Sequence, residues 1–269
     1  MITEGTFAGS EGQIAYRRKE PSEDVTPRRL VIIVHGYAEH GARYRHVAKD
    51  LAEHGAVTYL PDHLGHGRSD GERALIVDFE HVVDDLEALA SIAEAEYPGL
   101  PMVMVGHSMG GLLTARFVQR NPARLAGAAF LGAVLGDWQW AREVLALPEL
   151  PPSDSDPNGM SRDPEVCKEY AEDPLVYHGT YKRPLLESEV ACLDRFNEEI
   201  DKITVPVLFM HGDADPFVPP ADTRDAVERM ASADKTFHLY EEARHELVNE
   251  TNKADVIRDL RAFVERVAR

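Results

Sequence analysis

The sequence predicts an α/β fold: a mostly parallel sheet flanked by helices, with a helical cap inserted between two of its strands. Three observations support this. Short apolar runs that do not alternate with polar residues recur along the chain, as expected of strands buried on both faces. Segments with helical periodicity lie between these runs. The regular alternation stops after about residue 134 and resumes near residue 205.

Six short segments are predicted to be strands, and five longer ones are predicted to be helices. The strands are residues 30–34, 56–60, 102–105, 126–133, 205–210 and 236–240. The helices are residues 44–54, 79–96, 112–119, 222–230 and 253–267. The helix over 79–96 has the clearest pattern, because its apolar residues share one face. Strands that alternate with helices imply a parallel sheet with helices on both faces.

Residues 135–201 are predicted to be a cap, between the two parts of an α/β core at 1–134 and 202–269. Within this stretch, residues 149–201 hold 14 acidic and 5 basic side chains. Their net charge of −9 is half of the chain's net charge of −18. A structureless loop of roughly 65 residues is uncommon in a compact domain. The alternative is a long surface connection with short helices. The acidic face of the cap is read as a solvated surface.

The composition and charge of the chain argue against several classes of partner and location. The chain has 269 residues, 43% of them apolar, and a net charge of −18, which argues against nucleic acid and anionic membranes as main partners. Two cysteines, Cys167 and Cys192, do not form a disulfide scaffold. The N-terminal segment has no signal-peptide pattern, and no apolar run reaches the roughly 18 residues of a membrane span. We therefore expect a soluble, cytoplasmic protein.

The segment Gly106-His107-Ser108-Met109-Gly110 contains a Gly-x-Ser-x-Gly pattern. It follows a predicted buried strand and precedes a predicted helix, which is the setting of a nucleophile elbow. Such a turn raises the serine hydroxyl above the sheet at a helix N-terminus, where free N–H groups stabilise an oxyanion. Ser108 is therefore the predicted nucleophile. The alternative is a glycine-rich turn that only joins a strand to a helix.

A serine nucleophile needs a base, and the base needs an acid to orient it. In this setting the acid and then the histidine follow the serine along the chain. Asp215 lies in the loop after the strand at 205–210, with Asp213 as its rival nearer the strand end. His245 lies in the loop after the strand at 236–240. We predict Asp215 and His245 as the partners of Ser108.

Two backbone N–H groups are predicted to form the oxyanion hole. One belongs to Met109, the residue after the nucleophile. The other is expected in the loop after the first long strand, which begins His35-Gly36-Tyr37. Gly36 permits close backbone approach, so the N–H of Tyr37 is the predicted second donor.

With these residues the chain resembles the α/β-hydrolases, and within them the monoacylglycerol lipases and related lysophospholipases. Four segments carry the resemblance, which covers nearly the whole chain and is weakest in the cap: residues 35–44, 62–71, 106–111 and 173–176. It implies the same roles for Ser108, Asp215, His245, Tyr37 and Met109. Tyr37 departs from the pattern, because a small residue is usual there, and its bulk is expected to reshape the pocket.

The resemblance implies a serine hydrolase that cleaves a small lipid ester, most simply monoacylglycerol, without a cofactor. It also implies a cap that admits a fatty acyl chain and makes transient contact with a lipid surface. Seven apolar residues are candidates to line the acyl pocket, although each could equally pack the cap's own core. They are Leu135, Trp138, Trp140, Val144, Leu145, Leu147 and Leu150.

Other interpretations remain open at this point. A lysophospholipase or broad carboxylesterase would use the same residues, and a non-catalytic ligand-binding protein could share the fold. His63 and His66 could suggest a metal site, with His35, His40 and His46 nearby, but no cysteine or clustered carboxylate set completes a ligand pattern. No metal is expected. The oligomeric state is left open.

Overall fold

The computed structural model describes residues 2–151 and 156–269. Its centre is an eight-stranded sheet in the order β1-β2-β4-β3-β5-β6-β7-β8. The strands are β1 (Ile2–Ala8), β2 (Gln13–Lys19), β3 (Arg29–Val34), β4 (Ala56–Pro61), β5 (Met102–His107), β6 (Gly127–Leu131), β7 (Val207–Gly212) and β8 (Lys235–Tyr240). The pairs from β4 to β8 are parallel, whereas β1 and β2 join antiparallel at one edge.

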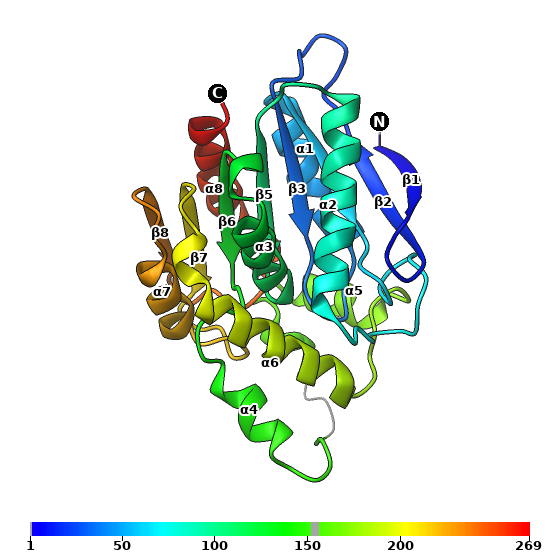
Figure 1. Ribbon diagram of the computed structural model, residues 1–269, viewed down its shortest axis with the longest axis vertical. Coiled ribbons are helices and arrows are strands. Elements are labelled where there is room, and N and C mark those ends of the chain that lie inside the picture. The colour runs from blue at the N-terminus through cyan, green and yellow to red at the C-terminus, as the bar shows by residue number, and fades with distance from the viewer. Residues whose placement is uncertain (1, 152–155) are drawn as a thin grey trace.

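Helices cover both faces of the sheet (Figure 1). They are α1 (Arg45–Glu53), α2 (Phe79–Glu96), α3 (Met109–Arg120), α4 (Gln139–Leu145), α5 (Pro164–Glu172), α6 (Arg183–Glu198), α7 (Pro220–Arg229) and α8 (Lys253–Val267). Apolar residues of α1 and α8 pack on one face, and those of α2, α3 and α7 pack on the other. The sheet's central strands are therefore buried on both sides, which confirms the predicted α/β-hydrolase fold.

All six predicted strands are present, and the five predicted helices agree to within three residues at each end. The largest difference is in α3, which begins at Met109 rather than at 112. The hairpin of β1 and β2 was not predicted. β1, at the sheet edge, has only exposed and partly buried residues, and β2 has buried residues among polar ones, so neither has the continuous apolar run of the central strands.

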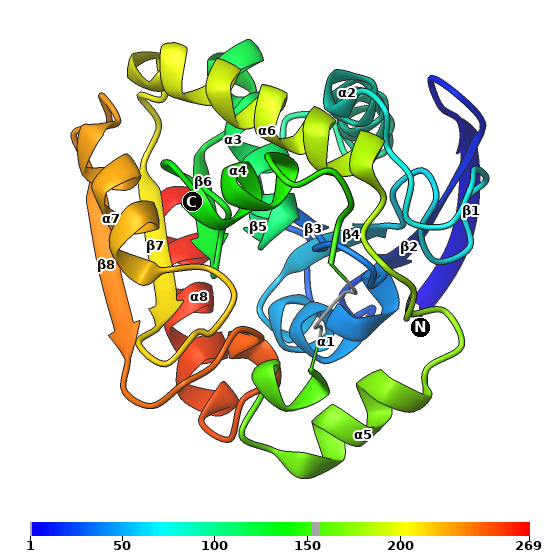
Figure 2. The same cartoon turned by 90° about the horizontal axis from the view of Figure 1, so that it is seen from below.

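Three helices, α4, α5 and α6, lie between β6 and β7 in the sequence. Seen from below, they extend across the carboxyl ends of the parallel strands (Figure 2). Loops at this edge of a parallel sheet form the usual binding crevice of such folds. Among the described residues, every helix is too short or too polar to pass through a bilayer.

Candidate active site

Ser108 occupies the sharp turn between β5 and α3. Its backbone has φ 52° and ψ −123°, a left-handed conformation that a residue with a side chain adopts only when its surroundings enforce it. Those surroundings are backbone hydrogen bonds. The Ser108 N–H donates to the Leu131 carbonyl at 3.0 Å, and its carbonyl accepts from Gly111 N–H at 2.9 Å and Val134 N–H at 3.1 Å. The turn therefore has the strained geometry predicted for a nucleophile elbow.

Asp215 lies in the loop between β7 and α7, with its carboxylate fully buried. Its Oδ1 accepts the backbone N–H groups of Phe217 at 2.9 Å and Val218 at 3.1 Å. Its Oδ2 accepts from Nδ1 of His245 at 2.8 Å and from Nε2 of His211 at 3.1 Å. Four donors thus fix the carboxylate and satisfy its negative charge.

Asp213, the alternative acid, is exposed and forms a different contact. Its Oδ1 accepts the Glu242 N–H at 2.6 Å, and the bond ties the β7 loop to the loop after β8. The structure therefore brings His245 to Asp215 and leaves Asp213 as a loop-fixing residue.

His245 follows β8, is buried and lines the same cavity as Ser108. Its Nδ1–H donates to Asp215, so Nε2 is the nitrogen left for a substrate-side proton. The ring packs against His107, with 4.6 Å between centroids, and edge-on to Phe217 at 5.3 Å. Gly132 approaches the Asp215–His245 pair, because a Cβ there would lie 3.4 Å from Nδ1 of His245.

Asp215 and His245 shift each other's pKa values in the directions that acid–base catalysis needs. Burial alone would lower the pKa of His245, but the charge and hydrogen bond of Asp215 outweigh it and raise that pKa above its usual value. Burial would raise the pKa of Asp215, but His245 and His211 hold it well below its usual value. Asp215 is therefore ionised at neutral pH and His245 is a strengthened base.

Tyr37 and Met109 both line the cavity beside Ser108. Met109 is the first residue of α3, where a backbone N–H has no acceptor within the helix. The Gly36–Tyr37 turn is close enough that a Cβ on Gly36 would lie 3.0 Å from the Ser108 Cβ. Glu39 fixes this turn, since its Oε1 accepts the Gly36 N–H at 2.8 Å.

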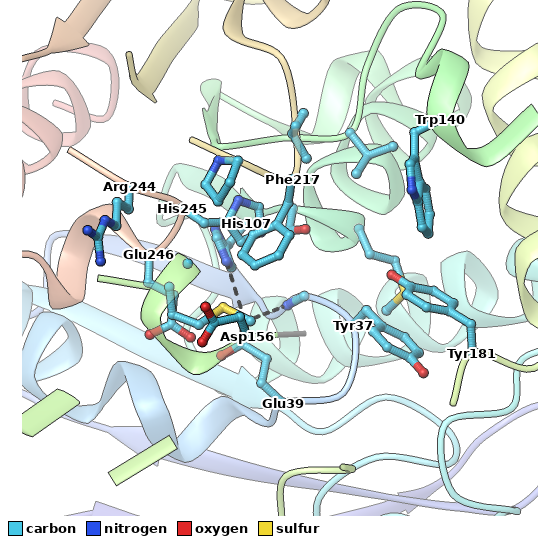
Figure 3. A pocket seen from close by; sticks show the side chains of 18 of the residues that line it. Tyr37, Glu39, His107, Trp140, Asp156, Tyr181, Phe217, Arg244, His245 and Glu246 are labelled. Carbon is cyan, nitrogen blue, oxygen red and sulfur yellow. Dashed lines mark hydrogen bonds and ion pairs between the residues drawn. The ribbon is translucent and has the colours of Figure 1, made fainter. Parts of the chain in front are cut away.

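The cavity has a volume of about 770 Å³, within the range of pockets that hold small ligands. Its two sides differ in chemistry (Figure 3). Glu39, Glu246 and Arg244 lie on one side, Tyr37, Tyr181 and Trp140 lie on the other, and the histidines lie between them. We call these the charged arm and the aromatic arm.

The charged arm is built around a buried ion-pair cluster. Arg43 pairs with Glu246 at 2.5 Å and with Glu39 at 3.3 Å. Glu39 also accepts a hydrogen bond from the Tyr44 hydroxyl at 2.6 Å. Burial and the neighbouring Glu246 raise the pKa of Glu39 to about 7, against the opposing effect of Arg43. The arm therefore presents the carboxyl oxygens of Glu39 and Glu246, which are already paired with Arg43.

The aromatic arm lies under the helices between β6 and β7. Tyr37 stacks on Tyr181 with 4.0 Å between ring centroids, and Trp140 meets Tyr181 edge-on at 5.7 Å. Of the seven apolar residues named from the sequence, four line the cavity: Trp138, Trp140, Val144 and Leu150. Leu135 and Leu145 instead pack in the core, and Leu147 is exposed.

The histidines that could suggest a metal serve as structural links between loops. His63 N–H donates to Nε2 of His35 at 3.0 Å, and Nε2 of His63 donates to the His35 carbonyl at 3.1 Å. Their rings lie 4.0 Å apart. Burial lowers the pKa of His63 to about 3, so this buried pair stays uncharged.

Several cavity residues were missed by the sequence argument. Glu39 and Arg43 were part of the segment 35–44 that carries the family resemblance, but neither was given a role of its own. Glu246 and Glu189 were given no role either. His211, at the end of β7, was not recognised as a second partner of Asp215. A polar residue directly beside a predicted catalytic residue, as Glu246 is beside His245, is the one available signal.

Comparison with known proteins identifies the family. A family model described as "Serine aminopeptidase, S33" matches residues 25–252. A monoacylglycerol lipase of Mycolicibacterium smegmatis is 34% identical over 97% of this chain and 96% of its own length. A human monoglyceride lipase is 32% identical over 84% of this chain and 78% of its own length.

Solved structures show the same architecture. A monoacylglycerol lipase of Paleococcus ferrophilus superposes with a TM-score of 0.78 at 26% identity, covering 98% of both chains. A soluble variant of monoglyceride lipase from Saccharomyces cerevisiae gives a TM-score of 0.87 at 21% identity, covering 100% of this chain and 96% of its own. The second likeness bears on the fold alone.

Proposed function

This chain belongs to the serine aminopeptidase S33 family of α/β-hydrolases, and we propose that it cleaves monoacylglycerols to glycerol and a free fatty acid through Ser108, His245 and Asp215. It is a carboxylic ester hydrolase, since its likeness to monoacylglycerol lipases extends over nearly the whole chain. The observation that best supports the proposed residues is the 2.8 Å bond from His245 to the buried Asp215, in a cavity that the strained Ser108 also lines.

In the proposed mechanism, His245 Nε2 accepts the Ser108 hydroxyl proton as Oγ attacks the ester carbonyl. Asp215 holds the Nδ1–H tautomer and stabilises the imidazolium that forms. The backbone N–H groups of Tyr37 and Met109 receive the oxyanion. His245 then returns the proton to the leaving alkoxide, so the alcohol departs and the acyl group stays on Ser108. Water, deprotonated by His245, then attacks the acyl carbonyl, and His245 returns that proton to Ser108 Oγ as the acyl–Oγ bond breaks and the fatty acid leaves.

The two arms assign the two halves of the substrate. The aromatic arm suits an acyl chain, because its lining is mostly aromatic and aliphatic. The charged arm suits the alcohol, because the carboxyl oxygens of Glu39 and Glu246 can bond glycerol hydroxyls. A phosphate in that position would face both carboxyl groups, while Arg43 is already paired with them and Arg244 donates to the carbonyls of Asn158 and Ser161. Uncharged glycerol is therefore favoured over a lysophospholipid headgroup.

The test is release of glycerol from monoacylglycerols of several chain lengths, with diacylglycerol, lysophosphatidylcholine and p-nitrophenyl esters assayed beside them. We expect kcat/KM for monoacylglycerols to exceed that for lysophosphatidylcholine by at least about tenfold, the equivalent of one lost polar contact. Turnover of short activated esters alone would reject the monoacylglycerol proposal and leave a carboxylesterase.

We also propose that residues 135–201 act as a cap over a core of 1–134 and 202–269 and touch lipid surfaces transiently. The exposure of Leu147 and of Trp140, 46% and 43%, supports this contact. The cytoplasmic location stays a prediction from the sequence.

Replacing Leu147 by serine is expected to weaken binding to phosphatidylcholine vesicles by about two- to fivefold, since an exposed leucine contributes up to about 1 kcal/mol when partly buried in lipid. Co-sedimentation measures the binding. Leu239→Ser, which changes an equally exposed leucine on β8, is the matched control. Equal losses in both variants, or none in Leu147→Ser, would argue against contact through the cap.

A further inference from the structure

The aromatic arm contains a carboxyl group in a position that the helix pattern reserves for an apolar side chain. Glu189 lies on α6, whose other buried residues are Leu185, Leu186, Cys192, Leu193 and Phe196. These positions recur every three or four residues, so residue 189 belongs to the same inward face. Glu189 is 1% exposed and lines the cavity. An apolar residue at this position would make the folded chain more stable, because burying a polar group without a partner costs free energy.

No hydrogen-bond partner compensates that cost within residues 2–151 and 156–269, where Oε2 of Glu189 is buried and unpaired. Burial raises the pKa of Glu189 to about 8. At neutral pH the group is mostly a neutral carboxylic acid, which offers one O–H donor and one carbonyl acceptor. Glu189 therefore presents hydrogen-bonding capacity, rather than charge, to whatever occupies the arm.

A second unpaired group belongs to the same arm. The Tyr37 hydroxyl is buried and has no hydrogen-bond partner among the described residues. Burial raises the pKa values of Tyr37 and Tyr181, so both phenols keep their protons at neutral pH. Glu189 lines the same cavity as the stacked phenol rings of Tyr37 and Tyr181, which Figure 3 shows beside Trp140.

We propose that this arm selects acyl groups that carry a hydroxyl along the chain, with the Glu189 carboxyl and the Tyr37 phenol as its hydrogen-bond partners. The inference deepens the proposed function and rests on its assignment of the acyl group to the aromatic arm. A plain alkyl chain would fill the same space but leave both groups unpaired. Sites that hydrogen-bond a substrate hydroxyl discriminate strongly against the analogue that lacks it, for this reason.

The test compares p-nitrophenyl stearate with p-nitrophenyl hydroxystearates whose hydroxyl lies early, midway or late in the chain. These esters test the acyl arm without glycerol, so a failure of the monoacylglycerol proposal would not affect the result. In the wild type we expect kcat/KM for at least one hydroxystearate to exceed that for stearate by about tenfold or more, as one unmade buried hydrogen bond implies.

Four variants locate the origin of the preference. Glu189→Leu is expected to abolish it, with a rise in kcat/KM for stearate and a fall for the hydroxystearate. Glu189→Gln keeps a donor and an acceptor and should retain most of it, whereas Tyr37→Phe should reduce it severalfold. Glu187→Leu, at an exposed acid two residues away, should change nothing. Turnover of p-nitrophenyl acetate, whose acyl group is short, is the reference rate measured in each variant, and Glu187→Leu should leave it at the wild-type value.

A binding measurement covers the case in which no ester is turned over. The chain's two tryptophans, Trp138 and Trp140, both line the arm, so tryptophan fluorescence reports its occupation. Ser108→Ala should bind the preferred hydroxystearate about tenfold more tightly than stearate, for the same hydrogen-bond reason. The proposal is overturned if every hydroxystearate matches stearate within twofold, or if Glu189→Leu keeps the preference.

Discussion

Replacing Ser108 by alanine is expected to lower kcat for ester hydrolysis by about 10⁵- to 10⁶-fold, the size of loss seen when a serine nucleophile is removed. The reason is chemical rather than structural. Alanine keeps a Cβ in the same left-handed turn, so the backbone hydrogen bonds to Leu131, Gly111 and Val134 are retained. The melting temperature should therefore change little while turnover disappears.

The control for this variant is Ser91→Ala, which removes the hydroxyl of an exposed serine on α2. It should retain full kcat. If Ser108→Ala kept more than about one hundredth of wild-type kcat, covalent catalysis through Ser108 would be wrong, because noncovalent contributions leave far less activity.

The second large effect is expected for Asp215→Asn, with a loss of about 10⁴-fold in kcat. An amide at this position can donate toward Nδ1 of His245, which would favour the tautomer that has its proton on Nε2. That tautomer cannot accept the Ser108 proton. Asp213→Asn is the matched control, since Asp213 is exposed and accepts the Glu242 N–H. Comparable losses in both variants, or a larger loss in Asp213→Asn, would contradict the assignment of Asp215.

The same variant makes a prediction about pH. Catalysis requires neutral His245, so kcat/KM rises with pH as this histidine loses its proton. Because Asp215 raises the pKa of His245, the wild-type midpoint should lie above the usual histidine value. Without that charge, burial dominates and lowers the pKa, so the midpoint in Asp215→Asn should move to lower pH. Glu39, with a pKa of about 7, titrates in the same range. A shift of the midpoint in Asp215→Asn would assign the titration to His245, which Asp215 contacts directly.

The sequence predicted those features that follow from local pattern or from chain order. Buried parallel strands appear as apolar runs, and Ser108, Asp215 and His245 lie in loops that such a fold brings to one edge of the sheet. The hairpin of β1 and β2 escaped prediction because its strands mix polar and apolar residues. Its signal was the Gly9-Ser10-Glu11-Gly12 cluster, which is typical of a turn between two strands.

The chemistry of the two arms could not be predicted, because it depends on contacts between distant segments. Arg43 and Glu246 are 203 residues apart in the sequence, yet they form one buried ion pair. The acidic cap was read as a solvated surface, and for Glu189 this interpretation is wrong, since the side chain faces the cavity from the inner side of α6. Helical periodicity over 185–196 was the unused signal.

The most direct test of the central claim is to locate the acyl-enzyme. The protein is mixed with a slowly hydrolysed p-nitrophenyl ester, quenched in acid during turnover and digested, and the peptides are analysed by mass spectrometry. We predict one acyl group per chain, on the peptide that contains Ser108, and none in Ser108→Ala. An acyl group on another residue, or rapid turnover with no acylated peptide at any time, would contradict a mechanism through Ser108.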